Sequence, residues 1–284
     1  MKRYIIALFG LFLLPVLGMN HARAQVGITS VPFLQIEPDS RAAGMGNTGV
    51  AIADNAAAVF WNPAGLAFQK GNQVSITHSE WLPAFNADLF YDYLVGKYYI
   101  EGIGTIGAHI TYLNLGEQIR TNEQGLEQGR FNSYEFAGGF SYGAKLSDNF
   151  SLGGGFRFIF SSLAEGNVGG QRINPGSSVG VDLAALYKSR PFTFLGNKEA
   201  NFNAGLNISN IGPGIQYTDN AQKDPLPTIF RIGWSFKTNL DPEGIYTLTI
   251  AIDFSKILAR SDTTGTDGVL RALFTSWDSY TLNN

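Results

Sequence analysis

Apolar and polar residues alternate one by one over most of the chain after residue 72. From Tyr246 to Phe254 every second residue is aliphatic or aromatic, and the residues between them are threonine, alanine or aspartate. The same alternation runs from Phe230 to Lys237 and from Ser178 to Lys188. Because successive side chains of a β-strand point to opposite faces, each run predicts a strand with one apolar face and one polar face.

The alternation predicts roughly nine strands, most of them as long as the nine to eleven tilted residues that cross a bilayer. We expect them near residues 73–81, 88–101, 104–117, 130–146, 149–163, 176–189, 200–211, 227–239 and 244–258. Two are ambiguous. The second has aromatic residues on both faces, so its register stays open, and the third loses its phase at Leu113 and Leu115.

The connections between these strands alternate in length. Short turns are expected at 102–103 and 147–149, and longer polar segments at 118–129, 164–175 and 212–226. Transmembrane barrels have such short periplasmic turns and longer extracellular loops. A soluble β-sandwich or lipocalin-like barrel also alternates, but its apolar face need not be so rich in Phe, Tyr and Trp. We therefore predict an all-β fold, a transmembrane antiparallel β-barrel over residues 73–284.

The first 24 residues have the pattern of a secretory signal peptide. Lys2 and Arg3 precede an apolar stretch over 4–17, and Ala22-Arg23-Ala24 forms a cleavage site. Export and a membrane barrel together place the protein in the cell outer membrane.

The composition fits a membrane barrel and excludes some other classes. Charged residues make up 15% of the chain, against about 25% in soluble domains. There is no cysteine, so no disulfide can hold the exported chain together. The net charge of -3 gives no reason to expect nucleic acid as a partner.

Residues 25–72 do not alternate and are rich in small residues. Asp54 or Asn55 is a candidate cap for a helix over 56–61, and Asn62 can cap a second turn that begins at Pro63. We interpret this block as a small N-terminal helical hatch within the barrel; a plain N-terminal extension is the alternative. The residues that define the hatch motif are Arg41, Gly44, Met45, Gly46, Trp61, Asn62, Pro63 and Gly65.

The chain offers little catalytic chemistry. No cluster of residues has metal-ligand spacing, a zinc site without cysteine is improbable, and no cofactor is expected. The polar residues expected in the lumen are His109, Arg157, Asp182, Arg231 and Asp253. They either pair with one another or form a charged lining that binds a ligand or holds the hatch. A Ser-His-acid site built around His109 is the weaker alternative, and we do not predict an enzyme.

Two blocks make the chain recognisable. Residues 31–46 read VPFLQIEPDSRAAGMG and residues 61–67 read WNPAGLA. With weaker matches at 113–116, 181–183, 208–213 and 225–227, they resemble the PorV/PorQ family, with the lead-in at 38–41 closer to the PorV branch. That family is related to the FadL-type transporters. The resemblance implies a barrel of fourteen strands, and because 279–284 lacks an alternating run, we expect C-terminal strands to be missing from this sequence.

The resemblance also implies a function. Such proteins belong to the type IX secretion system, bind the C-terminal signal domains of secreted cargo, and deliver the cargo to the attachment complex at the cell surface. The implied partners are cargo, the translocon and attachment components, and outer-membrane lipid. The segments 118–129, 164–175 and 212–226 are the candidate contact loops. The alternative is a FadL-like transporter of long-chain fatty acids or other hydrophobic solutes, whose pocket would be lined by Phe33, Met45, Phe60, Trp61 and Leu66.

Overall fold

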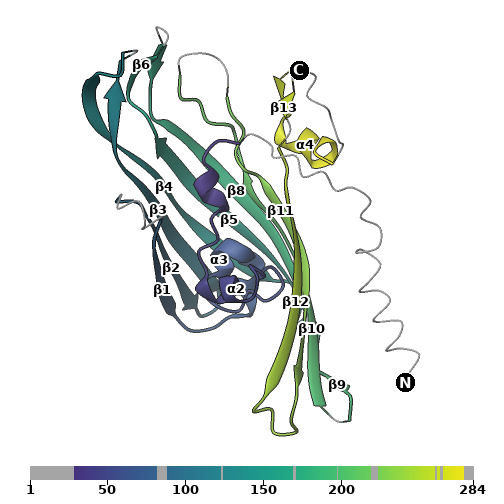
Figure 1. Cartoon of the computed structure of the whole chain (residues 1–284). Coiled ribbons are helices and arrows are strands. Elements are labelled where there is room, and N and C mark those ends of the chain that lie inside the picture. Colours follow the sequence, from purple (N-terminus) through teal and green to yellow (C-terminus); the bar gives the residue numbers. More distant parts are fainter. Residues whose placement is uncertain are drawn as a thin grey trace.

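Ten strands form one curved antiparallel sheet in the computed structural model of the chain (Figure 1). The structure describes residues 29–81, 88–122, 124–168, 171–196, 198–218, 223–259, 261–262 and 265–277. The main path of the sheet follows the chain in the order β1 (Gln73–Glu80), β2 (Phe90–Ile100), β3 (Gly104–Thr121), β4 (Glu127–Lys145), β5 (Phe150–Ser162), β8 (Gly176–Lys188), β10 (Lys198–Ile211), β11 (Ile229–Asn239) and β12 (Thr247–Ile257). The short strand β9 (Phe192–Phe194) pairs with β10. The predicted signal peptide lies outside the described residues.

The all-β prediction is confirmed, and the alternation placed most strand ends within three residues. The hairpin of β3 and β4 is the main correction, because the prediction assigned 118–129 to a loop. The two strands instead stay paired as far as Thr121 and Glu127. A bulge between Asn114 and Glu117, with Gly116 at φ 69°, accounts for the lost phase at Leu113 and Leu115.

The two ends of the sheet differ in their connections. At one end, here called the turn end, the connections are 101–103, 146–149, 189–197 and 240–246. At the other, here called the loop end, they are 81–89, 122–126, 163–175 and 212–228. Within the described residues β1 and β12 each pair on one side only, so this part of the sheet is not closed into a ring.

Residues 29–72, here called the inner segment, lie on the concave side of the sheet (Figure 1). They contain the 3-10 helices η1 (Pro32–Gln35) and η2 (Pro63–Phe68) and the short α-helices α2 (Ser40–Gly44) and α3 (Ala58–Trp61). The expected helix over 56–61 is shorter than predicted. Asn55 accepts a hydrogen bond from the Ala57 amide in the turn before α3, and α3 ends at Asn62, as the following Pro63 predicts.

The two faces of the sheet differ as the alternation predicts. On the concave face Glu135, Asp182 and Leu186 are almost fully buried. On the convex face large apolar side chains are exposed, including Phe140 at 72%. The core of this molecule therefore lies between the inner segment and the sheet. On the convex face Trp277 packs against Phe230 and Phe254, and many other large apolar side chains remain exposed.

A few small elements complete the fold. Strands β6 (Gly166–Val168) and β7 (Gln171–Ile173) form a separate hairpin at the loop end, and β13 (Ser261–Asp262) pairs with β14 (Gly265–Thr266) before α4 (Val269–Thr275). None of the helices in the described ranges combines the length and the apolar composition that a membrane-spanning helix needs.

Candidate functional site

Asn62 is the central polar contact between the inner segment and the sheet. Its side-chain amide donates to the carbonyls of Val50, at 2.8 Å, and of Ala185 on β8, at 3.0 Å. Its side-chain oxygen accepts from the Ala64 amide and caps η2. Asn62 is fully buried, so one side chain joins two turns of the inner segment to the wall.

Glycines on the strands allow the inner segment to approach the sheet at backbone distance. A Cβ at Gly153 would overlap the backbone of Ala64, and one at Gly143 would lie 2.6 Å from the Ala67 nitrogen. A Cβ at Gly205 would overlap the Val50 carbonyl oxygen, and one at Gly107 or Gly233 would meet the side chain of Val59 or Val50. These glycines therefore mark the positions where the strands contact the inner segment most closely.

Strand side chains also bind the backbone of the inner segment. Ser151 on β5 donates to the Ala64 carbonyl at 2.8 Å, and Thr105 on β3 donates to the Gln69 carbonyl at 2.6 Å. On β12, Asp253 accepts from the amides of Gly49 and Val50 at 2.7 and 2.8 Å. The inner segment is thus held from both sides of the curved sheet.

We expect Ser151→Ala to lower the free energy of unfolding by about 1 kcal/mol, because it removes one buried hydrogen bond to Ala64. Urea unfolding of the refolded protein, followed by tryptophan fluorescence, measures this loss. Ser255→Ala, on an exposed position of β12, is the control and should leave the midpoint unchanged. Equal midpoints for both variants would contradict the contact.

Two buried arginines lie in the interior, and they are held differently. Arg157 on β5 forms an ion pair with Asp182 on β8, and the second carboxylate oxygen of Asp182 accepts from the Asn210 amide at 2.9 Å. Arg231 on β11 instead stacks on the rings of Phe60 and Trp61, at 5.2 and 5.5 Å from their centroids. A buried cation on aromatic faces gains about 2 kcal/mol, so Arg231 also fixes α3.

Glu37 of the inner segment lies within the electrostatic reach of Arg231. Burial raises the pKa of the Glu37 carboxyl, and the positive charge of Arg231 opposes that rise. Asp253, which lies on the neighbouring strand, adds to the rise through its negative charge. The interior therefore contains coupled charges of both signs rather than a single isolated group.

A further series of side-chain hydrogen bonds was not predicted as a site. Tyr217 donates to the Ser161 hydroxyl at 2.9 Å, and Ser161 donates to the buried Glu135 carboxylate at 2.8 Å. Tyr217 belongs to the irregular 212–228 connection, so these hydrogen bonds join the loop end to β4 and β5. The sequence feature that could have indicated this site is Glu135, an acidic residue on the polar face of β4.

The structure does not assemble a catalytic site at His109. The imidazole is buried on β3, and its Nδ1 has no hydrogen-bond partner among the described residues. A Ser-His-acid site needs an acid that orients the base through this kind of contact. No group of three or more His, Cys, Asp or Glu side chains suited to a metal ion is found in the described ranges either.

The pocket expected for a transporter is not assembled as predicted. Phe33 and Phe60 line one small cavity. Trp61 and Leu66 are buried in the same core but do not line it, and Met45 is 39% exposed. The cavity offers about 10 Å³, enough for about one water molecule. An acyl chain has no room there.

Comparison with known proteins decides the family. The family model for the type IX secretion system protein PorV matches residues 19–264. The chain belongs to the PorV family. This assigns it to the outer membrane as a component of the type IX secretion system. The search of curated proteins finds no match.

The exposed apolar side chains of the convex face suit the outer-membrane location of the PorV family. Phe90, Tyr112, Tyr134 and Phe160 form a row of rings across β2 to β5, with centroids 5.8 to 5.9 Å apart. Aromatic rows of this kind lie at the membrane–water interface of barrels. The row lies toward the loop end of the sheet.

The hatch-motif residues of this PorV family member divide into two groups. Trp61, Asn62, Pro63 and Gly65 are buried together between α3 and η2. Arg41, Gly44, Met45 and Gly46 lie on the exposed side of α2, where Arg41 pairs with Asp54 at 2.6 Å. The two blocks that carry the resemblance thus have different environments, one packed against the sheet and one exposed.

The polar lumen residues all lie on the concave face. His109, Arg157, Asp182 and Arg231 are buried and Asp253 is half-buried. The structure brings Arg157 and Asp182 into direct contact, and it places Arg231 and Asp253 against different parts of the inner segment.

Proposed function

We propose that this chain binds the C-terminal signal domains of secreted cargo at its loop end and passes the cargo to the attachment complex. Residues 25–72 act in this proposal as a hatch that fills the barrel. The observation that carries the proposal is the contrast between the two regions: the interior is packed, whereas the loop end has ordered structure that projects beyond the sheet.

The packed interior favours a binding role over transport. The inner segment approaches five strands at glycine positions, and the cavity beside it holds about one water molecule. At the loop end the interior is also covered, because Ile215 and Leu226 are buried in the same core as Phe33. A solute would have to displace this core to pass.

The described parts of two loop-end connections are held together by hydrogen bonds. The connections 163–175 and 212–228 are joined by a bridge between Ile173 and Thr218, and the Asn174 amide donates to the Tyr217 carbonyl at 2.9 Å. Ser30 of the inner segment donates from its amide to the Pro225 carbonyl, also at 2.9 Å. Such preorganised surfaces bind partners at a lower entropic cost.

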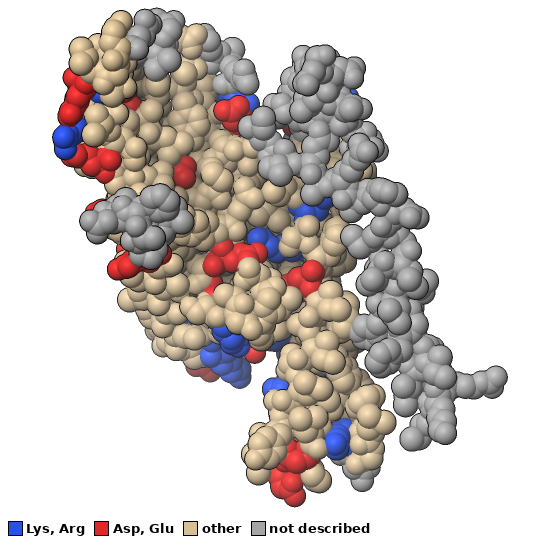
Figure 2. All heavy atoms as spheres, in the orientation of Figure 1, with Lys and Arg blue, Asp and Glu red and all other residues tan. Residues whose placement is uncertain are grey.

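The end of the β3–β4 hairpin is the most prominent of these surfaces. Beyond Asn114 and Tyr134 its two strands pair only with each other among the described residues. Arg130 bridges Glu117 and Glu127 at 2.8 and 2.7 Å, and charged side chains gather on this part of the molecule at the upper left of Figure 2. The hairpin projects from the sheet in Figure 1.

Two apolar side chains near the tip are suited to contact a partner. Ile119 is 55% exposed and Leu126 is 63% exposed, and both lie beyond the aromatic row, outside the lipid. Longer connections of barrels face the cell exterior, where cargo emerges. We therefore place the first contact with cargo on this hairpin.

Site-specific crosslinking in cells tests the proposal. A photoreactive amino acid is placed at Ile119 or Leu126 in the protein expressed with its cargo, and at Ile245 in the turn end as the matched control, which is 75% exposed. We expect cargo adducts at least ten times more abundant from the hairpin than from Ile245. Adducts from Ile245 alone, or none from the hairpin while cargo is secreted normally, would overturn it.

A further inference from the structure

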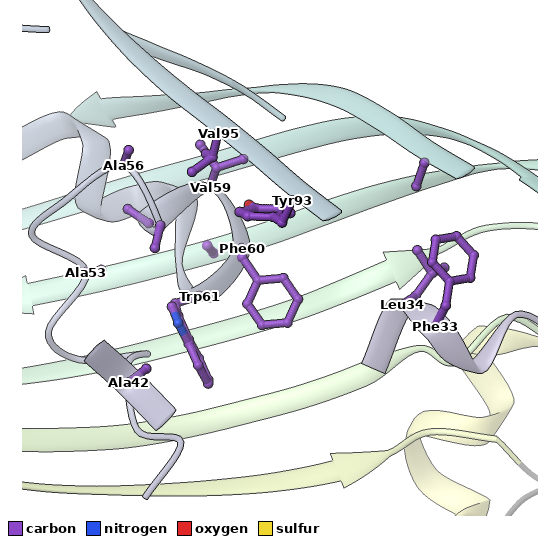
Figure 3. Close-up of a cluster of buried hydrophobic side chains, with 14 of the residues drawn as sticks. Phe33, Leu34, Ala42, Ala53, Ala56, Val59, Phe60, Trp61, Tyr93 and Val95 are labelled. Atoms are coloured by element: carbon purple, nitrogen blue, oxygen red, sulfur yellow. The ribbon is translucent and has the colours of Figure 1, made fainter. Parts of the chain in front are cut away.

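One small cavity lies between the inner segment and the sheet. It is bounded by η1 and α3 on one side and by β2, β3 and β5 on the other. Figure 3 shows Phe60 and Tyr93 on one side of this region and Phe33 and Leu34 on the other. With a volume of about 10 Å³, it has room for one ligand of the size of a water molecule or a halide ion.

Two buried polar atoms in the walls of this cavity lack a partner. The Tyr93 hydroxyl and the His109 Nδ1 make no hydrogen bond within the described part of the chain, and their residues are 3% and 6% exposed. The two rings lie side by side, with centroids 6.0 Å apart. A buried polar group without a partner is costly, so such a pair indicates that something else occupies the space.

Every polar side chain in the lining can donate a hydrogen bond. Arg157 contributes a guanidinium, Tyr93 and Thr111 contribute hydroxyls, and His109 can donate from one ring nitrogen. No carboxylate lines the cavity among the described residues. The nearest one that contacts the lining is Asp182, and both of its oxygens are already engaged, by Arg157 and by the Asn210 amide.

We propose that this cavity binds a single small inorganic anion of halide size. The Arg157 guanidinium and the neutral donors around it favour negative charge, and Phe33, Leu34 and Phe60 supply the apolar part of the cavity wall. The anion connects η1 to β2, β3 and β5 and holds the inner segment in place. This proposal is independent of the proposed function.

Bromide tests the site directly, because its anomalous scattering distinguishes it from water. Crystals of the protein grown in bromide should show an anomalous peak between Tyr93 and Arg157. In solution, the melting temperature should rise with the logarithm of the bromide concentration when gluconate maintains the ionic strength. A water molecule without an anomalous peak would overturn the proposal, and so would a peak with no bromide-dependent stability, which indicates an adventitious ion only.

A conservative variant separates the site from a general salt effect. Tyr93→Phe removes one donor and keeps the ring, and we expect it to reduce the bromide-dependent rise in melting temperature by at least half. Tyr98→Phe, at an exposed position of the same strand, should retain the full rise. An equal rise in both variants overturns the role of Tyr93. If Tyr93→Phe does not fold, the bromide titration of the unmodified protein still decides the proposal.

Discussion

Replacing Gly153 with valine is expected to prevent the inner segment from packing against β5. A Cβ at this position would overlap the nitrogen of Ala64 and the carbonyl carbon of Pro63. Overpacking a core costs about 1 to 3 kcal/mol when side chains can adjust. Here the opposing atoms belong to the backbone of η2, which Asn62 and Ser151 hold in place, so we expect a loss at or above the upper end of that range.

The neighbouring glycine provides a matched control. A Cβ at Gly154 would meet nothing closer than the Asp182 carbonyl oxygen at 3.6 Å, and its side chain would join the convex face. Gly154→Val should therefore refold with a urea midpoint close to that of the unmodified protein. Limited proteolysis adds a second measurement, since Gly153→Val should expose residues 29–72 to cleavage. Equal stability and equal protection for both variants would show that the inner segment does not contact β5 as described.

The strand pattern could be predicted from sequence because it rests on burial of alternate residues. The alternation of apolar and polar residues was enough to place three charged residues on the inner face, and the structure buries all three: Arg157, Asp182 and Arg231. Their partners could not be predicted. The contact between Arg157 and Asp182 depends on the register of β5 against β8, where Gly155 lies opposite Asp182, and a single strand contains no information on that register.

The projecting hairpin was missed for a related reason. Apart from Ile119 and Leu126, the residues between Glu117 and Arg130 are polar or glycine, so this stretch has the composition of a loop. Cross-strand hydrogen bonds and the ion pairs of Arg130 keep it in β conformation. The cap of η2 by Asn62 could be predicted, because an asparagine before proline is a local capping signal. The strand glycines could be interpreted only once the path of the inner segment was known.

The buried ion pair gives the second large effect. Arg157 is 4% exposed and Asp182 is 1% exposed, so neither charge has access to bulk water. Removing one partner of a buried pair costs about 3 to 5 kcal/mol, because the other charge stays desolvated without compensation. We therefore expect Arg157→Met and Asp182→Asn each to lower the free energy of unfolding by about that amount.

The double variant should be more stable than either single variant. Arg157→Met with Asp182→Asn removes both charges and keeps a side-chain oxygen that can accept from the Asn210 amide. Replacing a buried pair by neutral residues is often close to neutral, so we expect the double variant within about 2 kcal/mol of the unmodified protein. Urea unfolding of all four proteins gives the coupling energy. Additive losses would mean that the pair is not desolvated in the folded protein, and that the interior admits water beside Arg157.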